Sequence, residues 1–334
     1  MQTIRLGRTN LIVSKNGFGA LPIQRTDMET AVKILRKAYD GGINYFDTAR
    51  AYTDSEAKMG AALADVRENI IISTKTANFT VDGFWNDLKT SLETLKTDYI
   101  DIYQFHNPDF CPRPGDGTGL YEAMLEAKEK GLIRFIGITN HRLPIAEEAV
   151  LSGLYDTLQF PFSYLSGEKD IALVRLCEEH DVGFICMKAL AGGLITNAKA
   201  AYAALAQYPI APIWGIQRES ELDEFLVFQD QPVEMTEEMA AVIEADRKEL
   251  AGEFCRGCGY CMPCPVGINI GICSRIGLII RRAPSEGYFS PQWRAEMEKV
   301  NDCLNCGQCA QKCPYQLNPP QLLRKNYLDY QTFL

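Results

Sequence analysis

The sequence predicts an α/β protein, with a closed parallel (β/α)₈ barrel followed by a smaller cysteine-rich domain. Short apolar segments that resemble buried strands alternate with amphipathic stretches through about the first 230 residues, and eight such segments can be counted. After residue 252 the alternation stops, and eight cysteines fall into two short runs. Eight strand–helix units favour a closed barrel, although an open doubly wound sheet would also fit the count.

The expected strands are short and apolar, and turn signals bound them. They cover residues 16–19, 43–47, 69–75, 99–106, 134–139, 157–161, 183–188 and 213–216. The stretch 28–40 illustrates the intervening helices, because Asp27 is a plausible N-cap and Gly41 supplies the stop. Its expected apolar face contains Ala31, Leu35, Ala38 and Tyr39. We therefore place the barrel at 1–235, a connecting helix at 236–251 and the cysteine-rich domain at 252–334.

Composition narrows the class of protein. Of the 334 residues, 46% are apolar and 23% are charged, as in a globular protein with a sizeable core. A formal net charge of −9 argues against a nucleic-acid partner, which requires clustered Lys and Arg. The longest apolar runs are far shorter than a membrane-spanning helix, and the first residues do not resemble a signal peptide. We therefore expect no membrane partner and a cytoplasmic location.

Polar residues stand at or just after the ends of three successive expected strands. The segment FDTARAYTDSE contains Asp47 and Tyr52, IISTK ends at Lys75, and DIYQFH ends at His106. In a parallel barrel these strand ends meet at one face, so the four side chains could converge. Taken singly, the lysine could be a solvated group, the aspartate a helix cap and the histidine a structural residue. The combination favours catalysis.

Carbonyl reduction explains why these residue types would be needed together. The alkoxide that forms must be protonated, but a free tyrosine with a pKa near 10 is a poor acid at neutral pH. A neighbouring ammonium favours the phenolate and lowers that pKa. Lys75 can supply the charge, Asp47 can hold Lys75 in place, and His106 can donate a hydrogen bond to the substrate oxygen.

Residues 1–230 resemble the aldo-keto reductase family, whose Asp–Tyr–Lys–His tetrad lies in these local contexts. The opening LGRTNLIVSKNGFGA resembles that family's first strand, GITN and Gln159 match its nicotinamide-carboxamide positions, and ALAGGL resembles its pyrophosphate loop. The resemblance implies a small carbonyl or alcohol substrate. It also implies cofactor-binding roles for Gly19, Asn140, Gln159, Met187, Gly192, Gly193 and Arg218.

Three positions depart from the family pattern. Met187 stands where an aromatic ring often stacks on the nicotinamide, and Phe225 replaces a common Asn. Arg218 is the obvious cation for a 2′-phosphate, but Glu219 and Glu221 lie beside it and would repel phosphate. NAD(H) and NADP(H) both remain open, and so does a flavin.

The cysteine runs predict two [4Fe–4S] clusters in a ferredoxin-like domain. The runs are CRGCGYCMPCP and CLNCGQCAQKCP, and their cysteines are Cys255, Cys258, Cys261 and Cys264, then Cys303, Cys306, Cys309 and Cys313. The second run matches the C-x₂-C-x₂-C-x₃-C-P pattern of bacterial ferredoxins, in which the fourth cysteine ligates the other cluster. Two Cys₄ zinc sites are the alternative.

This pattern assigns Cys313 to the cluster of the first run and Cys264 to the cluster of the second. The first run departs from the pattern, because only two residues separate Cys261 from Cys264. Cys273 is a spare thiol that could substitute for Cys264. The fourth ligand of the second cluster is therefore left open between these two residues.

Three functions fit these observations. In the first, the barrel reduces or oxidises a carbonyl or alcohol, and the clusters relay electrons from a ferredoxin or another one-electron carrier. In the second, the protein is an NAD(P)H-dependent carbonyl reductase with structural or redox-sensing clusters. In the third, an inactive barrel carries an electron-transfer or sensor module. The complete tetrad argues against the third.

Overall fold

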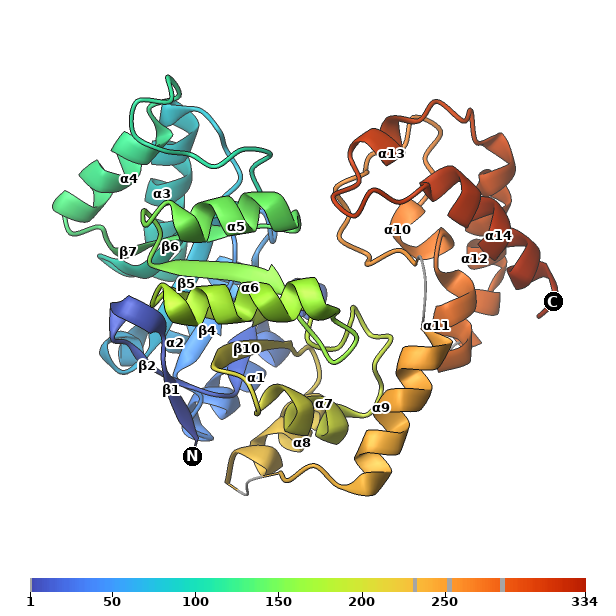
Figure 1. The fold of residues 1–334 in the computed structure, drawn as a ribbon, viewed down its shortest axis with the longest axis horizontal. Helices are drawn as coiled ribbons and strands as arrows, with labels where there is room; N and C mark the ends of the chain where they lie inside the picture. Colours follow the sequence, from blue (N-terminus) through green and yellow to red (C-terminus); the bar gives the residue numbers. More distant parts are fainter. Residues whose placement is uncertain (1, 231–232, 251–253, 283–285) are drawn as a thin grey trace. The chain divides into compact units, whose positions relative to one another are not determined.

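The computed structural model describes residues 2–230, 233–250, 254–282 and 286–334 (Figure 1). The chain divides into two compact units: unit 1 spans Met1–Ala189 and Lys199–Thr236, and unit 2 spans Leu190–Ala198 and Glu237–Leu334. A short segment that follows the barrel strand β9 therefore belongs to unit 2. The helix expected at 236–251 is α9, Glu237–Glu249, and it also lies in unit 2. The boundary predicted at residue 252 lies outside the described residues.

Eight parallel strands form a closed barrel in unit 1 (Figure 1). Each strand pairs with the next along the chain, and β10 closes the circle through Ile213↔Gly17 and Gly215↔Gly19 on β3. This closure confirms the predicted barrel and rules out the open sheet. The strands are β3 Gly17–Gly19, β4 Tyr45–Asp47, β5 Ile71–Thr76, β6 Ile100–His106, β7 Ile133–Thr139, β8 Thr157–Pro161, β9 Gly183–Met187 and β10 Ile210–Gly215.

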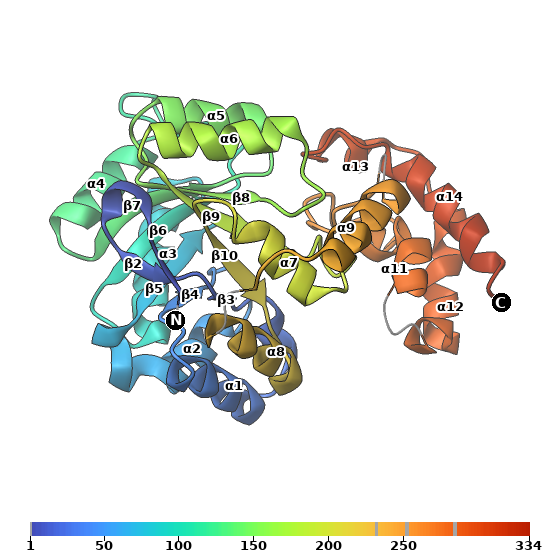
Figure 2. The ribbon, with the colours of Figure 1, turned by 60° about the horizontal axis from the view of Figure 1, so that its bottom comes forward.

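The helices of unit 1 surround the barrel, and Figure 2 shows α1, α2 and α8 side by side on its outside. Asp27 caps α1 as expected, because its carboxylate accepts a hydrogen bond from Thr30 N at 2.8 Å. Tyr39, expected on the same face, is half-buried, with its ring under the Arg36 guanidinium, and Ile34 is an additional buried residue of this helix. The helices are α1 Met28–Asp40, α2 Ser55–Leu63, α3 Val81–Leu95, α4 Leu120–Glu129, α5 Leu143–Leu151, α6 Glu168–Glu179, α7 Ala198–Leu205 and α8 Glu219–Asp230.

A hairpin that the sequence analysis did not identify covers one end of the barrel. Its strands, β1 Thr3–Arg5 and β2 Ile12–Ser14, pair antiparallel. Leu6, Leu11 and Val13 pack in one apolar cluster with barrel residues that include Tyr45. Because the hairpin covers the end where the strands begin, the opposite end, where they finish, is left to form the site.

Unit 2 is helical and has its own small core. Apolar side chains from four helices and the connecting segments enclose two of the cysteines, Cys261 and Cys273. Besides α9, its helices are α10 Ile270–Cys273, α11 Ile276–Arg282, α12 Pro291–Glu298, α13 Gln308–Gln311 and α14 Pro319–Gln331.

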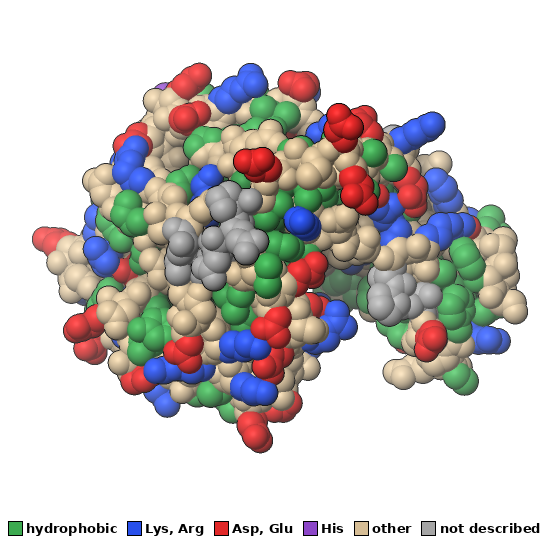
Figure 3. Space-filling model, turned by 90° about the horizontal axis from the view of Figure 1, so that it is seen from below, with side chains coloured by type: hydrophobic (Ala, Val, Ile, Leu, Met, Phe, Trp, Pro, Cys, Tyr) green, Lys and Arg blue, Asp and Glu red, His purple; other side chains and the backbone are tan. Residues whose placement is uncertain are grey.

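Two further findings bear on partners. Within the described ranges, no helix has both the length and the apolar character that crossing a membrane requires. On the face drawn in Figure 3, acidic and basic side chains are interspersed.

Candidate active site and cluster-binding pockets

Three neighbouring strands bring Asp47, Lys75 and His106 to the same end of the barrel. In the parallel register Asp47 pairs with Ser73 and Lys75 pairs with Gln104, so β4, β5 and β6 end close together. The Lys75 ammonium lies 2.7 Å from Asp47 Oδ1 and also donates to the Thr48 carbonyl. Both partners of the ion pair are almost fully buried, with 1% and 3% of their side chains exposed. An ammonium buried this deeply needs that compensation.

Tyr52 reaches the ion pair from the loop after β4. Two backbone hydrogen bonds, Tyr52 N to Ala49 O at 3.0 Å and Ser55 N to Tyr52 O at 2.9 Å, hold the loop in a tight turn. The centroid of the Tyr52 ring lies 5.4 Å from Lys75 Nζ and 5.7 Å from the His106 ring centroid. The four residues expected to meet at the strand ends therefore do lie together.

Burial controls the charge of the two bases in this group. It lowers the pKa of Lys75, and the attraction of Asp47 opposes that shift. Burial, followed by repulsion from Lys75 and Lys188, lowers the pKa of His106 to about 3. His106 is therefore a neutral imidazole near pH 7, with a single N–H to donate. Its Nδ1 is buried and has no hydrogen-bond partner among the described residues.

The sequence analysis did not identify a network of buried polar side chains that contacts Asp47 of the tetrad. Ser73 Oγ donates to Asp47 Oδ2 at 2.6 Å, and Gln104 Nε2 donates to Gln159 Oε1 at 3.0 Å. The alternation of side chains along each strand could have identified these network residues. Ser73 stands two residues before Lys75, and Gln104 two before His106, so each shares the face of its catalytic candidate. This network fixes the Asp47 carboxylate and, through it, Lys75.

Glu56, near the start of α2, links the segment that carries Tyr52 to strand β5 and helix α3. Its side chain is buried, forms an ion pair with Arg50, and accepts hydrogen bonds from Thr74 Oγ1 at 2.6 Å and Ser91 Oγ at 2.7 Å. Because Arg50 and Glu56 flank Tyr52 in the sequence, these bonds restrict the position of the tyrosine ring.

Gly19, Gln159 and Met187, three of the residues expected to bind the cofactor, stand on barrel strands, whereas Gly192 and Gly193 belong to unit 2. Gly19 ends β3, Met187 ends β9, and Gln159 lies on β8 next to the buried network. The Asn140 amide already has protein partners: its Nδ2 donates to Pro108 O at 2.9 Å, and its Oδ1 accepts from His141 N. The second N–H of that amide is the group it would offer to a carboxamide.

Arg218 is already paired with an acidic neighbour. Its guanidinium lies 2.5 Å from Glu221 Oε1, and Glu221 also accepts from the Arg218 backbone N–H. Glu219 turns to α1 instead, where hydrogen bonds from Lys33 and Lys37 lower its pKa to about 2. Of the two glutamates expected to oppose a 2′-phosphate, only Glu221 therefore contacts Arg218.

The eight clustered cysteines border two pockets. Cysteines from both runs contribute to each pocket. The first cysteine pocket is lined by Cys255, Cys258, Cys261 and Cys313, together with apolar residues such as Leu317 and Leu322. This is the set expected for the cluster of the first run, and it includes the cysteine from the second.

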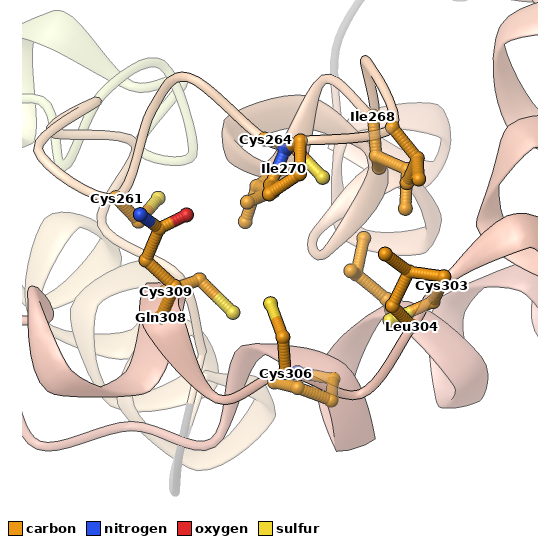
Figure 4. Close-up of a pocket in the computed structure, with 13 residues that line it drawn as sticks. Cys261, Cys264, Ile268, Ile270, Cys303, Leu304, Cys306, Gln308 and Cys309 are labelled. Carbon is orange, nitrogen blue, oxygen red and sulfur yellow. The ribbon is translucent and has the colours of Figure 1, made fainter.

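Figure 4 shows the second cysteine pocket, which Cys264, Cys303, Cys306 and Cys309 line together with apolar side chains such as Ile268. The sulfurs of Cys306 and Cys309 point into this pocket, and Cys264 lies on its opposite side. Cys261 also borders it, so this residue is common to both pockets. Cys273, the alternative to Cys264, is fully buried in the apolar core beside Ile276 and Met297.

The donor set of each pocket fits an iron–sulfur cluster. Burial and the neighbouring Cys255 and Cys258 raise the pKa of the Cys261 thiol to about 12, so this thiol is a poor thiolate by itself. A bound metal supplies the positive charge that deprotonates such thiols. A cluster of this type exchanges single electrons when bound.

Comparison with protein-family models places this site in a known family. The model of the aldo/keto reductase family matches residues 15–209, which include the tetrad. The chain belongs to this family. A second model, the 4Fe-4S dicluster domain, matches residues 254–318 and therefore spans all eight clustered cysteines. The protein is an oxidoreductase that combines an aldo-keto reductase barrel with an iron–sulfur domain.

Curated relatives match a similar part of the chain. The uncharacterized oxidoreductase YqkF of Bacillus subtilis is 32% identical over 211 residues, which cover 59% of this chain and 67% of that protein. The NADH-specific methylglyoxal reductase of Escherichia coli is 26% identical over 227 residues, which cover 59% of this chain and 70% of the relative. Among solved structures, the holo form of the aldo-keto reductase AKR11C1 from Bacillus halodurans is similar with a TM-score of 0.66 and 25% identity, covering 76% of this chain and 98% of that one.

Proposed function

We propose that this protein reduces or oxidises a small carbonyl or alcohol substrate at Tyr52, and that its clusters relay electrons to or from the barrel. The observation that supports this best is the buried Lys75–Asp47 ion pair, with the Tyr52 ring 5.4 Å from the ammonium. Burying an ion pair of this kind costs desolvation free energy, and this favours a functional role for the pair. A cation beside a phenol favours proton release from the phenol.

Each member of the tetrad has a separate proposed role. Tyr52 delivers a proton to the carbonyl oxygen, or takes one from the alcohol. Lys75 tunes that phenol, and Asp47 positions Lys75 with the help of Ser73. His106, neutral near pH 7, donates a hydrogen bond to the substrate oxygen and orients the carbonyl. Two electrons and two protons are needed per carbonyl, so single-electron carriers must act twice.

We propose that the fourth cysteine of each run, Cys264 or Cys313, ligates the cluster of the other run. The first cluster takes Cys255, Cys258, Cys261 and Cys313, and the second takes Cys264, Cys303, Cys306 and Cys309. The composition of the two pockets supports this assignment. Anaerobically prepared protein should then contain about eight irons and eight sulfides per chain, whereas stoichiometric zinc without acid-labile sulfide would contradict it.

A second candidate is a nicotinamide-dependent carbonyl reductase in which the clusters are structural or sense redox state. The relative from Escherichia coli, named as NADH-specific, favours it. The Arg218–Glu221 ion pair then predicts that NADH binds at least as well as NADPH. Flavin remains open as the group that would link two-electron and one-electron steps.

One measurement on anaerobically purified protein separates these candidates, and a second tests the catalytic role of the barrel that both share. Analysis of bound cofactors should show iron and sulfide in either case, but a relay between the clusters and a hydride donor calls for a flavin or another converter as well. The Tyr52→Phe variant should then lose about 10²- to 10⁴-fold in substrate turnover. Its reduction of an artificial one-electron acceptor and its iron content should not change. Unchanged substrate turnover would contradict the proposed role of the barrel.

A further inference from the structure

Arg275 joins three backbone segments of unit 2. Its Nε donates to Gly271 O at 3.0 Å, and its Nη1 donates to Gly192 O at 3.2 Å. Its guanidinium also lies flat against Gly257, where an added Cβ would be only 2.5 Å from Nη2. An added Cβ at Gly192 would lie 2.9 Å from Nη1. The guanidinium therefore occupies a slot that exists because two of these positions are glycines.

One side of this slot belongs to the first cysteine pocket. Gly257 stands between Cys255 and Cys258, and its backbone N–H donates to Cys255 Sγ at 3.3 Å. Gly271, the second partner of Arg275, has its carbonyl oxygen 3.9 Å from the same sulfur. Arg275 thus places a positive charge against the backbone that surrounds Cys255.

The other side of the slot is the loop that leaves β9 of the barrel. This segment, Leu190–Ala198, belongs to unit 2. Its backbone turns through left-handed conformations at Ala191, Gly192 and Gly193, with φ of 50°, 68° and 91°. Arg282 holds the far end of the turn, because its Nε donates to Leu194 O at 2.7 Å. Two guanidinium groups therefore fix the path of the chain immediately after β9.

We propose that Arg275 couples the charge of the first cluster to the order of the loop after β9. A reduced cluster is one unit more negative than an oxidised one, so an adjacent guanidinium stabilises the reduced state and raises its reduction potential. The same attraction strengthens the hold of Arg275 on Gly192. Because the two effects share one side chain they are reciprocal, and cluster reduction should make the loop more ordered.

This inference rests on the proposed cluster assignment, but it adds a positioning role that the tetrad does not contain. Residues 188 and 189 link this loop directly to the end of β9, where Met187 stands. Ordering the loop therefore restrains a barrel strand that ends at the candidate active site.

The experiment compares three variants of the full chain, purified anaerobically with its clusters. Arg275→Gln retains a hydrogen-bond donor but removes the charge, whereas Arg275→Lys retains the charge but lacks the planar fork that reaches two carbonyls. Arg281→Gln is the matched control, because this nearby arginine pairs with Asp329 instead. The readouts are the reduction potential of each cluster, from a spectroscopic redox titration, and hydrogen exchange of residues 190–197 in oxidised and reduced protein.

We expect Arg275→Gln to lower the potential of one cluster and leave the other unchanged. Loop exchange should become about ten- to a hundredfold faster, as for the loss of one hydrogen bond to a charged group. Arg275→Lys should keep most of the potential but still speed exchange, and Arg281→Gln should change neither quantity. In the unaltered protein, reduction should slow loop exchange.

Two results would overturn the inference: equal potentials in Arg275→Gln and Arg281→Gln, or loop exchange that is indifferent to reduction in the unaltered protein. If Arg275→Gln loses its cluster, loop exchange in Arg275→Lys is compared with loop exchange in the unaltered protein. Identical exchange in these two proteins would contradict the coupling. Both readouts use dithionite as the reductant and no substrate. These readouts therefore test the inference independently of the substrate turnover that tests Tyr52.

Discussion

The two units hold their chemistry in different ways. In the barrel, the Lys75 ammonium is fixed by protein groups alone, namely Asp47, the Thr48 carbonyl and the network through Ser73. In unit 2, the cysteines that would bind clusters border the small apolar core itself, and Cys261 belongs to both. The barrel site is therefore preorganised by its own fold, whereas unit 2 should depend on its clusters for stability.

The largest expected effect tests whether the buried ion pair serves catalysis. Lys75→Met removes the charge beside Tyr52, so turnover should fall by about 10²- to 10⁴-fold. Lys58→Met is the matched control: Lys58 is also buried, but its ammonium binds the Thr26 carbonyl at 2.7 Å and Asp54 and has no hydrogen bond to a tetrad residue among those described. That variant should lose stability but keep its turnover per folded molecule. Equal turnover losses in both variants would indicate that Lys75 is structural.

The next effect separates the two units directly. Anaerobic removal of iron by a chelator should abolish hydrogen-exchange protection in 254–282 and 286–334, because emptied thiol pockets leave too little core. Amides of the barrel strands β3–β10 should keep their protection. If both units lost protection together, the barrel would depend on the clusters, and the contrast drawn above would be wrong.

A smaller effect tests the fourth ligand of the second cluster. Cys264→Ser should reduce the iron content by up to about half, because it removes a thiolate from one of two clusters. Cys273→Ser should leave iron content unchanged and cost stability, since it puts a hydroxyl into the apolar core beside Ile276. Iron and acid-labile sulfide analysis distinguishes the two variants, and the reverse pattern would make Cys273 the ligand.

The smallest effect concerns pH and is confined to the barrel. The pKa of His106 is lowered from 6.5 to about 3, so between these values the unfolded state binds a proton that the folded state does not. Stability should therefore fall as pH drops from 6.5 towards 3, with a slope of up to about 1.4 kcal/mol per pH unit from this group. Burial lowers the pKa of His141 in the same direction.

Urea unfolding at pH 7 and pH 5, followed by tryptophan fluorescence, measures this dependence. The His106→Gln variant should show a flatter profile than the unaltered protein. An identical slope in the two proteins would mean that His106 titrates normally in the folded barrel.

The sequence by itself determined the features that depend on local patterns. All eight barrel strands were located, because buried strands and their turn residues leave a short-range signal. The order of Asp47, Tyr52, Lys75 and His106 along successive strand ends was equally legible, since parallel strands finish on one face. The spacing of the cysteine runs specified a cluster domain, because a compact metal cofactor needs its ligands at short fixed intervals.

Only the tertiary structure decided contacts between residues far apart in the chain. Gln104 on β6 meets Gln159 on β8, with β7 between these strands, and the first hairpin covers one barrel end, but neither segment carries a local sign of its partner. Cys264 borders the second pocket while Cys273 enters the core, although both are thiols close in sequence. Arg275 meets Gly192, 83 residues away, in a slot that two glycines leave open. Side-chain packing in three dimensions selects such pairs, and no periodicity along one strand or helix encodes them.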